Sequence, residues 1–278
     1  MSLLLDIHSV LVLISSQDFW SAPFTKSGKS SLVPKGPWMY AMTGIGVYYK
    51  ADPSLLNDVV PKPLKVVDGD MFSYLTEIVS WSPNAVELAV EAPEQLQYSE
   101  GAFFVKVDYN GKNYLYCPYM WVDNDLSLLR GLLAGWPKKL AKIAITRLHP
   151  LLPPLERPKK GLKVGGYLAR AGSTLYRIKV ELTSDTESDR VPLLSEYSFI
   201  LPRYFAGVAP GLTTVNELVE FEGEAVVRSW EGLGHIDVIG GVNDELYFFK
   251  PVSEVRGFYF LLLLKVRGLR NLGMVEGF

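Results

Sequence analysis

Hydrophobic and polar residues alternate over several short runs of this chain, and these runs are rich in β-branched and aromatic side chains. Alternation with a period of two predicts β-strands, because successive side chains of an extended strand point to opposite faces. Asn110-Gly111 lies between two of the runs and predicts a tight hairpin, since a type I′ turn needs positive φ at both central residues. The predicted strands cover residues 45–51, 72–81, 103–109, 113–122, 174–183, 196–201 and 224–230.

Residues 51–60 predict a short helix, with Asp52 as the N-cap and Pro53 at the first helical position. The proline-rich segment 150–160 predicts a surface connection within one domain, because strand patterning resumes after it without a change of composition. We therefore expect a single, mostly antiparallel β domain with few helices over residues 1–278, with roughly the first thirty residues as an N-terminal extension.

A second helix is predicted within residues 123–137, where an Asp-Asn-Asp cap precedes a run of leucines. Their spacing predicts that they fill one buried face of the helix; they are Leu126, Leu129, Leu132 and Leu133. Gly135 is placed to end the helix in the left-handed conformation, and Pro137 prevents its continuation. Lys138 is therefore expected at a fixed backbone position directly after the helix.

Composition indicates a globular protein and argues against nucleic-acid binding, disulfide bonds and metal sites. Hydrophobic residues make up 48% of the 278 residues and charged residues 21%, as in ordinary globular proteins. The formal charge of −2 argues against a nucleic-acid surface. Cys117 is the only cysteine, which excludes a disulfide framework and a thiolate zinc cluster. The three histidines lack metal-ligand spacing, so we expect no metal site.

Neither of the two apolar runs in the chain matches a membrane or export signal. Leu3–Ser15 is interrupted by Asp6 and His8 and has no preceding Lys or Arg, so it does not match a signal peptide. Residues 258–264 are far shorter than the roughly 20 apolar residues that cross a bilayer. The sequence predicts a soluble, cytoplasmic protein without a membrane partner.

Pro-Lys-Lys occurs twice, at residues 137–139 and 158–160. A lysine amine attacks a carbonyl only after losing its proton, and its ordinary pKa of about 10.4 leaves roughly one in a few thousand neutral at pH 7. Burial among apolar groups lowers that pKa strongly, which outweighs the preference of a helix C-terminus for a cation. Trp136 and Leu140 flank the first copy, whereas the second lies among charged residues and glycine and is interpreted as solvated charge.

Residues 112–145 resemble the acetoacetate decarboxylase family, whose hallmark is an Asp-rich cap, an Ala/Leu-rich helix carrying Arg-Gly or Gly-Arg, and then aromatic-Pro-Lys-Lys-Leu. DVVPKPLKV (58–66) resembles the family's Val-Val-Pro element, and QYSEG (97–101) its glutamate segment. Weaker matches follow in the family order at 196–204, 229–238 and 250–255. The resemblance extends over roughly residues 35–265.

This resemblance implies that Lys138 is the lysine that forms a Schiff base and that the adjacent Lys139 supports its activation, as a second cation does in this family. Glu100 matches the acidic residue near the imine, where it would shuttle a proton or orient the substrate. Tyr98, two positions earlier, matches a pocket tyrosine, and Glu77 matches a second family glutamate.

The family fold implied is a cone-like, largely antiparallel β-barrel with peripheral helices, usually in a homo-oligomer. Trp136 replaces the usual Tyr or Phe before the proline, and its side chain is expected to line the pocket. The reaction implied is decarboxylation of acetoacetate or a related β-keto acid through a lysine iminium, which needs no metal or organic cofactor.

The chain departs from the family at two positions. Met42 stands where the decarboxylases place an arginine for the substrate carboxylate, and Lys50, Arg130 or Arg203 could replace that arginine in space. Relatives that use the lysine for aldol condensation and dehydration of keto acids can carry a glutamine four positions before it, where this chain has Ala134. Decarboxylation is the first hypothesis, a Schiff-base aldolase-dehydratase the second, and a non-catalytic binding barrel for small molecules the third.

Three further residues have less specific interpretations. Cys117 is expected to be a small core residue, because no histidine is near it in sequence. His235 is expected at the surface or in a hydrogen bond, and Tyr259 is a weak candidate for the pocket wall.

Overall fold

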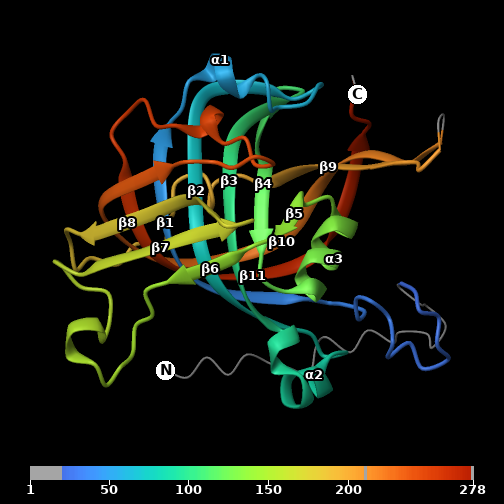
Figure 1. Cartoon of the computed structure of the whole chain (residues 1–278), viewed down its shortest axis with the longest axis horizontal. Coiled ribbons are helices and arrows are strands. Elements are labelled where there is room, and N and C mark those ends of the chain that lie inside the picture. The colour runs from blue at the N-terminus through green and yellow to red at the C-terminus, as the bar shows by residue number, and fades with distance from the viewer. Residues whose placement is uncertain (1–20, 210–211, 277–278) are drawn as a thin grey trace.

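The computed structural model describes residues 21–209 and 212–276 and shows a mostly antiparallel β fold with few helices, as predicted (Figure 1). Its strands are β1 (Met39–Lys50), β2 (Lys65–Trp81), β3 (Gln97–Tyr109), β4 (Lys112–Val122), β5 (Lys138–Leu140), β6 (Lys142–Ile145), β7 (Lys163–Arg170), β8 (Ser173–Leu182), β9 (Phe199–Ala206), β10 (Thr213–Val238) and β11 (Arg256–Gly273). Its helices are α1 (Pro53–Leu56), α2 (Val86–Glu91) and α3 (Asp125–Ala134), with 3₁₀ turns η2 (Pro93–Gln95), η3 (Pro153–Leu155) and η4 (Tyr247–Phe249). The run Leu3–Ser15 lies outside the described residues.

The strands form one sheet that closes on itself. Its order is β11-β1-β2-β3-β4-β9-β10, and β10 pairs again with β11 to complete a ring. Strand β10 is long enough to pair with three other strands. Its beginning pairs with β9, its end with β8, and its centre with β11. Strands β8, β7 and β6 continue the sheet from the end of β10 and pack across β1, β2 and β3.

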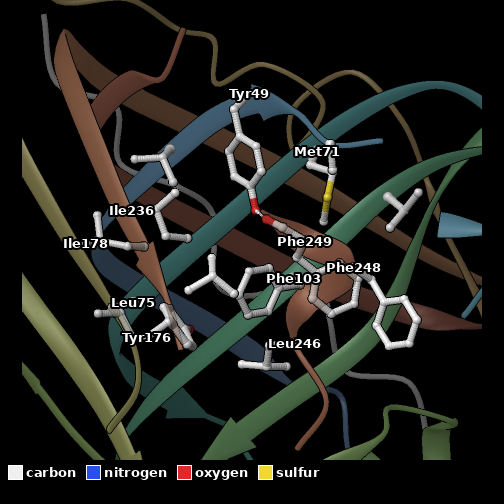
Figure 2. Packing of buried hydrophobic residues seen from close by; sticks show 14 of the residues in the cluster. Tyr49, Met71, Leu75, Phe103, Tyr176, Ile178, Ile236, Leu246, Phe248 and Phe249 are labelled. Atoms are coloured by element: carbon white, nitrogen blue, oxygen red, sulfur yellow. Dashed lines mark hydrogen bonds between the residues drawn. The ribbon is translucent and has the colours of Figure 1, made fainter. Parts of the chain in front are cut away.

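Two hydrophobic cores lie on the two faces of β1, β2 and β3, because alternate residues of each strand point in opposite directions. The first core lies under β7, β8 and η4 and is rich in aromatic rings (Figure 2). In it, the rings of Phe103 and Phe249 stack 4.7 Å apart, and the Tyr49 hydroxyl donates to the Phe249 carbonyl oxygen at 2.9 Å. The second core takes its residues from the ring strands, including Tyr74 and Phe104, and from the segment between β8 and β9, and it borders the pocket described below.

The hairpin turn and the start of the short helix were predicted correctly, although α1 covers only Pro53–Leu56 of the predicted 51–60. Asn110 and Gly111 have φ of 53° and 80°, and they join β3 to β4 in the predicted hairpin. Asp52 caps α1 by accepting a hydrogen bond from the Ser54 backbone N–H at 2.9 Å. The segment 150–160 is largely exposed, as expected of a surface connection.

The strand lengths differ more from the prediction. Strand β10 extends well beyond the predicted 224–230, and β11, which contains the apolar run 258–264, was not predicted as a strand. The run does not alternate because most of its residues are buried whichever face they occupy. Among the described residues, no helix has the length and apolar character needed to cross a membrane.

Candidate active site

Lys138 is the first residue of β5 and lies where helix α3 has just ended. The Asn124 side chain caps the start of α3, accepting from the Ser127 backbone N–H at 2.8 Å. Gly135 ends the helix with φ of 98°, as predicted. Strand β5 then runs parallel to β4, and this pairing sets Lys138 beside Met120 on the face that carries the second core. In Figure 1, α3 and β5 lie next to each other at one side of the sheet.

The amine of Lys138 is buried and donates hydrogen bonds to two oxygen atoms. Its Nζ donates to Glu100 Oε2 at 2.8 Å and to Ser127 Oγ at 2.9 Å. The Lys138 and Glu100 side chains are only 7% and 5% exposed, and Ser127 is fully buried. The proton that the amine must lose before it can attack a carbonyl therefore has an acceptor in direct contact.

A tyrosine fixes the orientation of the Glu100 carboxylate. The Tyr74 hydroxyl donates to Glu100 Oε1 at 2.6 Å, so each carboxylate oxygen has one strong partner. Burial and the neighbouring carboxylate raise the pKa of Tyr74 well above its ordinary value. The hydroxyl thus keeps its proton and acts as a hydrogen-bond donor in the site.

The side chain of Lys138 reaches the pocket by crossing the surface of α3 at a glycine. A Cβ atom added to Gly131 would lie 2.3 Å from Lys138 Cδ and 2.4 Å from Cε, closer than any tolerable contact. A glycine in a helix costs about 1 kcal/mol relative to alanine. Here the missing side chain provides the space in which the lysine lies.

The helix face that is buried is different from the predicted one. Leu126 is buried, but Leu129, Leu132 and Leu133 are only half-buried, so the prediction of a leucine face directed at the core was wrong. The buried face carries Ser127, Arg130 and Gly131, and Ala134 continues it at the next helical position. The reason is that α3 covers the pocket in which the Lys138 amine and the Glu100 carboxylate lie, rather than an apolar sheet.

The pocket is small, with a volume of about 90 Å³. Its remaining walls are largely apolar or aromatic, and the wall residues include Tyr40, Met42, Tyr98, Phe104, Met120, Trp136, Phe199, Phe221 and Leu262. Burial raises the pKa of both Tyr40 and Tyr98 to about 12, so neither hydroxyl acts as a base near neutral pH. The Trp136 ring meets the rings of Phe199 and Phe221 edge-on at 5.1 and 5.7 Å.

Lys139 lies on the opposite face of β5 from Lys138, because consecutive strand residues alternate. Its Nζ donates to the Asn243 carbonyl oxygen at 2.6 Å and to Asp244 Oδ1 at 2.8 Å. The Asp244 carboxylate also accepts hydrogen bonds from Trp121 Nε1 at 3.1 Å and from Arg170 Nη1 at 3.1 Å. The structure therefore does not bring the predicted supporting cation into the pocket with Lys138.

Other candidates also lie away from the pocket. The side chain of Glu77 is 30% exposed and pairs with Arg147 on the surface. Lys50 pairs with Asp70 at 2.6 Å, outside the pocket wall. Lys159, in the second Pro-Lys-Lys, donates to the carbonyl oxygen of Pro153 at 2.7 Å.

Arg130 lines the pocket, whereas Arg203 does not. Arg203 instead donates to the Leu133 carbonyl oxygen at 2.7 Å and to Glu217 at 2.6 Å. Ala134, where some relatives have glutamine, contributes a small apolar part of the wall.

Cys117 is fully buried in the second core, and burial raises the pKa of its thiol well above the ordinary value, in keeping with the predicted core role. His235 is exposed on β10, and Tyr259 packs in the first core rather than at the pocket. In the part of the chain that the structure describes, no group of three or more His, Cys, Asp or Glu residues is placed to hold a metal ion.

Sequence reasoning missed Ser127, Tyr74 and Gly131. Ser127 and Gly131 could have been found as small residues spaced by four on the helix that leads to Lys138. Tyr74 could not, because its contact depends on register: it pairs with Ala102, two residues from Glu100, and so lies diagonally across from the carboxylate.

Comparisons with known proteins agree with this architecture. The family model described as Acetoacetate decarboxylase (ADC) matches residues 21–273. An acetoacetate decarboxylase-like enzyme from Sphingomonas wittichii RW1 is 28% identical, with a TM-score of 0.84, over 91% of this chain and 98% of that one. A comparison with curated proteins gave no match.

More distant structures share the fold. The enduracididine biosynthesis enzyme MppR, complexed with the condensation product of pyruvate and imidazole 4-carboxaldehyde, is 22% identical with a TM-score of 0.81, over 91% of this chain and 96% of that one. Acetoacetate decarboxylase from Legionella pneumophila is 20% identical with a TM-score of 0.63, over 93% of this chain and 94% of that one. Since the family model spans nearly all of the sequence, this chain belongs to the acetoacetate decarboxylase family.

Proposed function

We propose that the protein is an enzyme in which Lys138 forms a Schiff base with the ketone of a small keto acid. The observation that carries this proposal is a buried lysine amine held 2.8 Å from a carboxylate inside a small, mostly apolar pocket. A structural ion pair would gain little from such burial, since removing two charges from water largely offsets their attraction. This arrangement suits a reactive amine, because the carboxylate can take its proton inside a mostly apolar pocket.

The first steps are common to any such reaction. Lys138 transfers a proton to Glu100, and the lone pair of the neutral amine forms a bond to the ketone carbon. The ketone oxygen then takes up two protons, one from the attacking nitrogen and one from Glu100, and leaves as water. A protonated imine remains on Lys138, and its positive charge draws electrons from the adjacent carbon.

The first candidate reaction is decarboxylation of acetoacetate or a related β-keto acid. The electron pair of the bond to the carboxylate moves toward the iminium, CO₂ leaves, and an enamine forms. Glu100, which the preceding steps leave as a carboxylate, would take up a proton from solvent and pass it to the enamine carbon. Water would then hydrolyse the protonated imine, releasing a methyl ketone and returning Lys138 as an ammonium group. The apolar walls provided by Met42, Met120 and Leu262 favour a step in which the carboxylate charge disappears.

The second candidate is aldol condensation and dehydration of a keto acid that keeps its carboxylate. Glu100 would take a proton from the carbon next to the iminium, which gives the same kind of enamine. The enamine carbon would form a bond to the carbonyl carbon of an aldehyde, and Glu100 would return the proton to the aldehyde oxygen. The resulting hydroxyl group would leave as water with the second proton of the carbon next to the iminium, and hydrolysis of the imine would release an unsaturated keto acid. Arg130 favours this alternative, because a retained carboxylate gains from a cation in the pocket, whereas a departing one loses that attraction.

Reductive trapping tests the proposal. Borohydride added with acetoacetate should leave an irreversible adduct on Lys138, located by peptide mass spectrometry. Release of CO₂ from acetoacetate identifies the first reaction; consumption of pyruvate with an aldehyde and appearance of an enone identify the second. If acetoacetate and pyruvate both leave the protein unmodified, the non-catalytic binding function replaces both reactions.

Tyr74→Phe is expected to lower kcat by about tenfold, because Glu100 loses the 2.6 Å hydrogen bond that orients it. The measurement is steady-state turnover of whichever keto acid is processed. Tyr49→Phe is a matched control, since it removes a buried tyrosine hydrogen bond from the first core. A similar loss in both variants would show that only packing had been disturbed.

Lys159→Ala is expected to leave turnover and trapping unchanged within about twofold, because this lysine contacts only a loop carbonyl in the structure and its loss should cost little. Turnover and adduct yield are compared with those of the unmodified protein. A large decrease would mean that the second Pro-Lys-Lys carries the reaction.

A further inference from the structure

We infer that Arg130 binds the carboxylate of the substrate and so restricts the pocket to carbonyl compounds that carry an acid group. This inference rests on the proposed Schiff-base function of Lys138. It assigns a role in specificity to a residue of α3. On β1, Met42 stands where the family's decarboxylases place an arginine for the substrate carboxylate.

Arg130 is a buried cation whose hydrogen bonds are incomplete. The residue is 6% exposed, and within the described residues its Nη1 and Nη2 atoms are buried without a hydrogen-bond partner. Buried arginines in proteins are normally paired with carboxylates or other acceptors, because desolvated N–H groups are costly when unsatisfied. An acceptor that arrives with a ligand would complete the arrangement.

Aromatic rings surround the guanidinium, whose two Nη atoms make no hydrogen bond within the described residues. The Arg130 Cζ atom lies 4.4 Å from the ring centroid of Trp38, 4.8 Å from that of Tyr40 and 5.9 Å from that of Tyr98. Contacts with ring faces stabilise the positive charge, whereas the N–H groups lie in the guanidinium plane. The charge is therefore stabilised in place while two in-plane nitrogens stay available for a carboxylate.

Glu100 does not supply the acceptor that the Nη atoms of Arg130 lack. Glu100 already accepts from Tyr74 on one oxygen and from Lys138 on the other. The Tyr98 ring borders both cations, with Lys138 Nζ at 5.5 Å and Arg130 Cζ at 5.9 Å from its centroid. A short molecule with a ketone at one end and a carboxylate at the other can thus meet both groups.

Two pairs of probes of matched size isolate the carboxylate: pyruvate with butan-2-one, and acetoacetate with pentan-2-one. The concentration that gives half-maximal borohydride trapping on Lys138 is measured for each. In Arg130→Met, that concentration is expected to rise about 10- to 100-fold for at least one acid, while both ketones change by less than about twofold. Arg130→Lys keeps the charge but loses the bidentate geometry, and an intermediate value is expected.

Equal changes for acids and ketones, or no change for either, would overturn the inference and leave Arg130 with a structural role. If the unmodified protein is trapped by none of the four probes, the proposed function itself fails. Arg177→Met serves as a surface control, because Arg177 is half-exposed and pairs only with Asp237 in the described chain. If Arg130→Met does not fold, Arg130→Lys provides the test. A lower preference for acids over ketones in its half-maximal trapping concentrations supports the inference, and an unchanged preference overturns it.

Discussion

Lys138→Ala is expected to abolish borohydride-trapped adducts and to lower turnover by on the order of 10⁴-fold or more, since no other amine among the described residues lies in the pocket wall. The adjacent Lys139 cannot replace it, because it faces the other side of β5 and is held by Asp244. Peptide mass spectrometry after reduction and steady-state turnover are the two measurements.

The variant also leaves Glu100 buried without its cation, which can cost about 3–5 kcal/mol of stability. Lys138→Ala/Glu100→Gln removes both charges and separates loss of chemistry from loss of folding. If a folded variant without Lys138 still forms the adduct, the assignment of the nucleophile is wrong.

Gly131→Ala is expected to lower turnover by about 100-fold or more while leaving the helix intact. The new Cβ would occupy the space of Lys138 Cδ and Cε, so the amine must move away from Glu100 and Ser127. A displacement of about 1 Å in a reacting group can cost 100-fold in rate. Turnover, trapping rate and thermal unfolding are compared with the unmodified protein.

This result differs from the usual effect of such a change, because alanine stabilises a helix interior by about 1 kcal/mol relative to glycine. Leu132→Ala is the matched control: it alters the next helical position, which is only half-buried and does not line the pocket. Full activity in Gly131→Ala would show that the lysine can reach the pocket by another path.

The sequence predicted the features that depend on neighbouring residues. The ends of α3 were predictable because Asn124, Gly135 and Pro137 act locally. The hairpin at Asn110 was predictable for the same reason, and Lys138 and Glu100 could be named from the family motif. These signals need no knowledge of which strands become neighbours.

What the sequence did not predict depends on pairing between distant segments. The orientation of Lys139 follows from its register beside Trp121, and the contact of Tyr74 with Glu100 follows from the register of β2 and β3. The leucine spacing indicated the wrong helix face, because a pocket wall needs small and polar residues where a core needs leucine. Buried strands such as β11 also lack the alternation that sequence patterns detect.

The pocket groups contributed by α3 follow one another at helical spacing, at positions 127, 130, 131 and 134, whereas the acid–tyrosine pair belongs to the sheet. A family built in this way can evolve new selectivity by exchanging a few side chains along a single helix, with its catalytic acid left in place. Grafting those four positions between homologues is a direct route to redesigning what such an enzyme accepts.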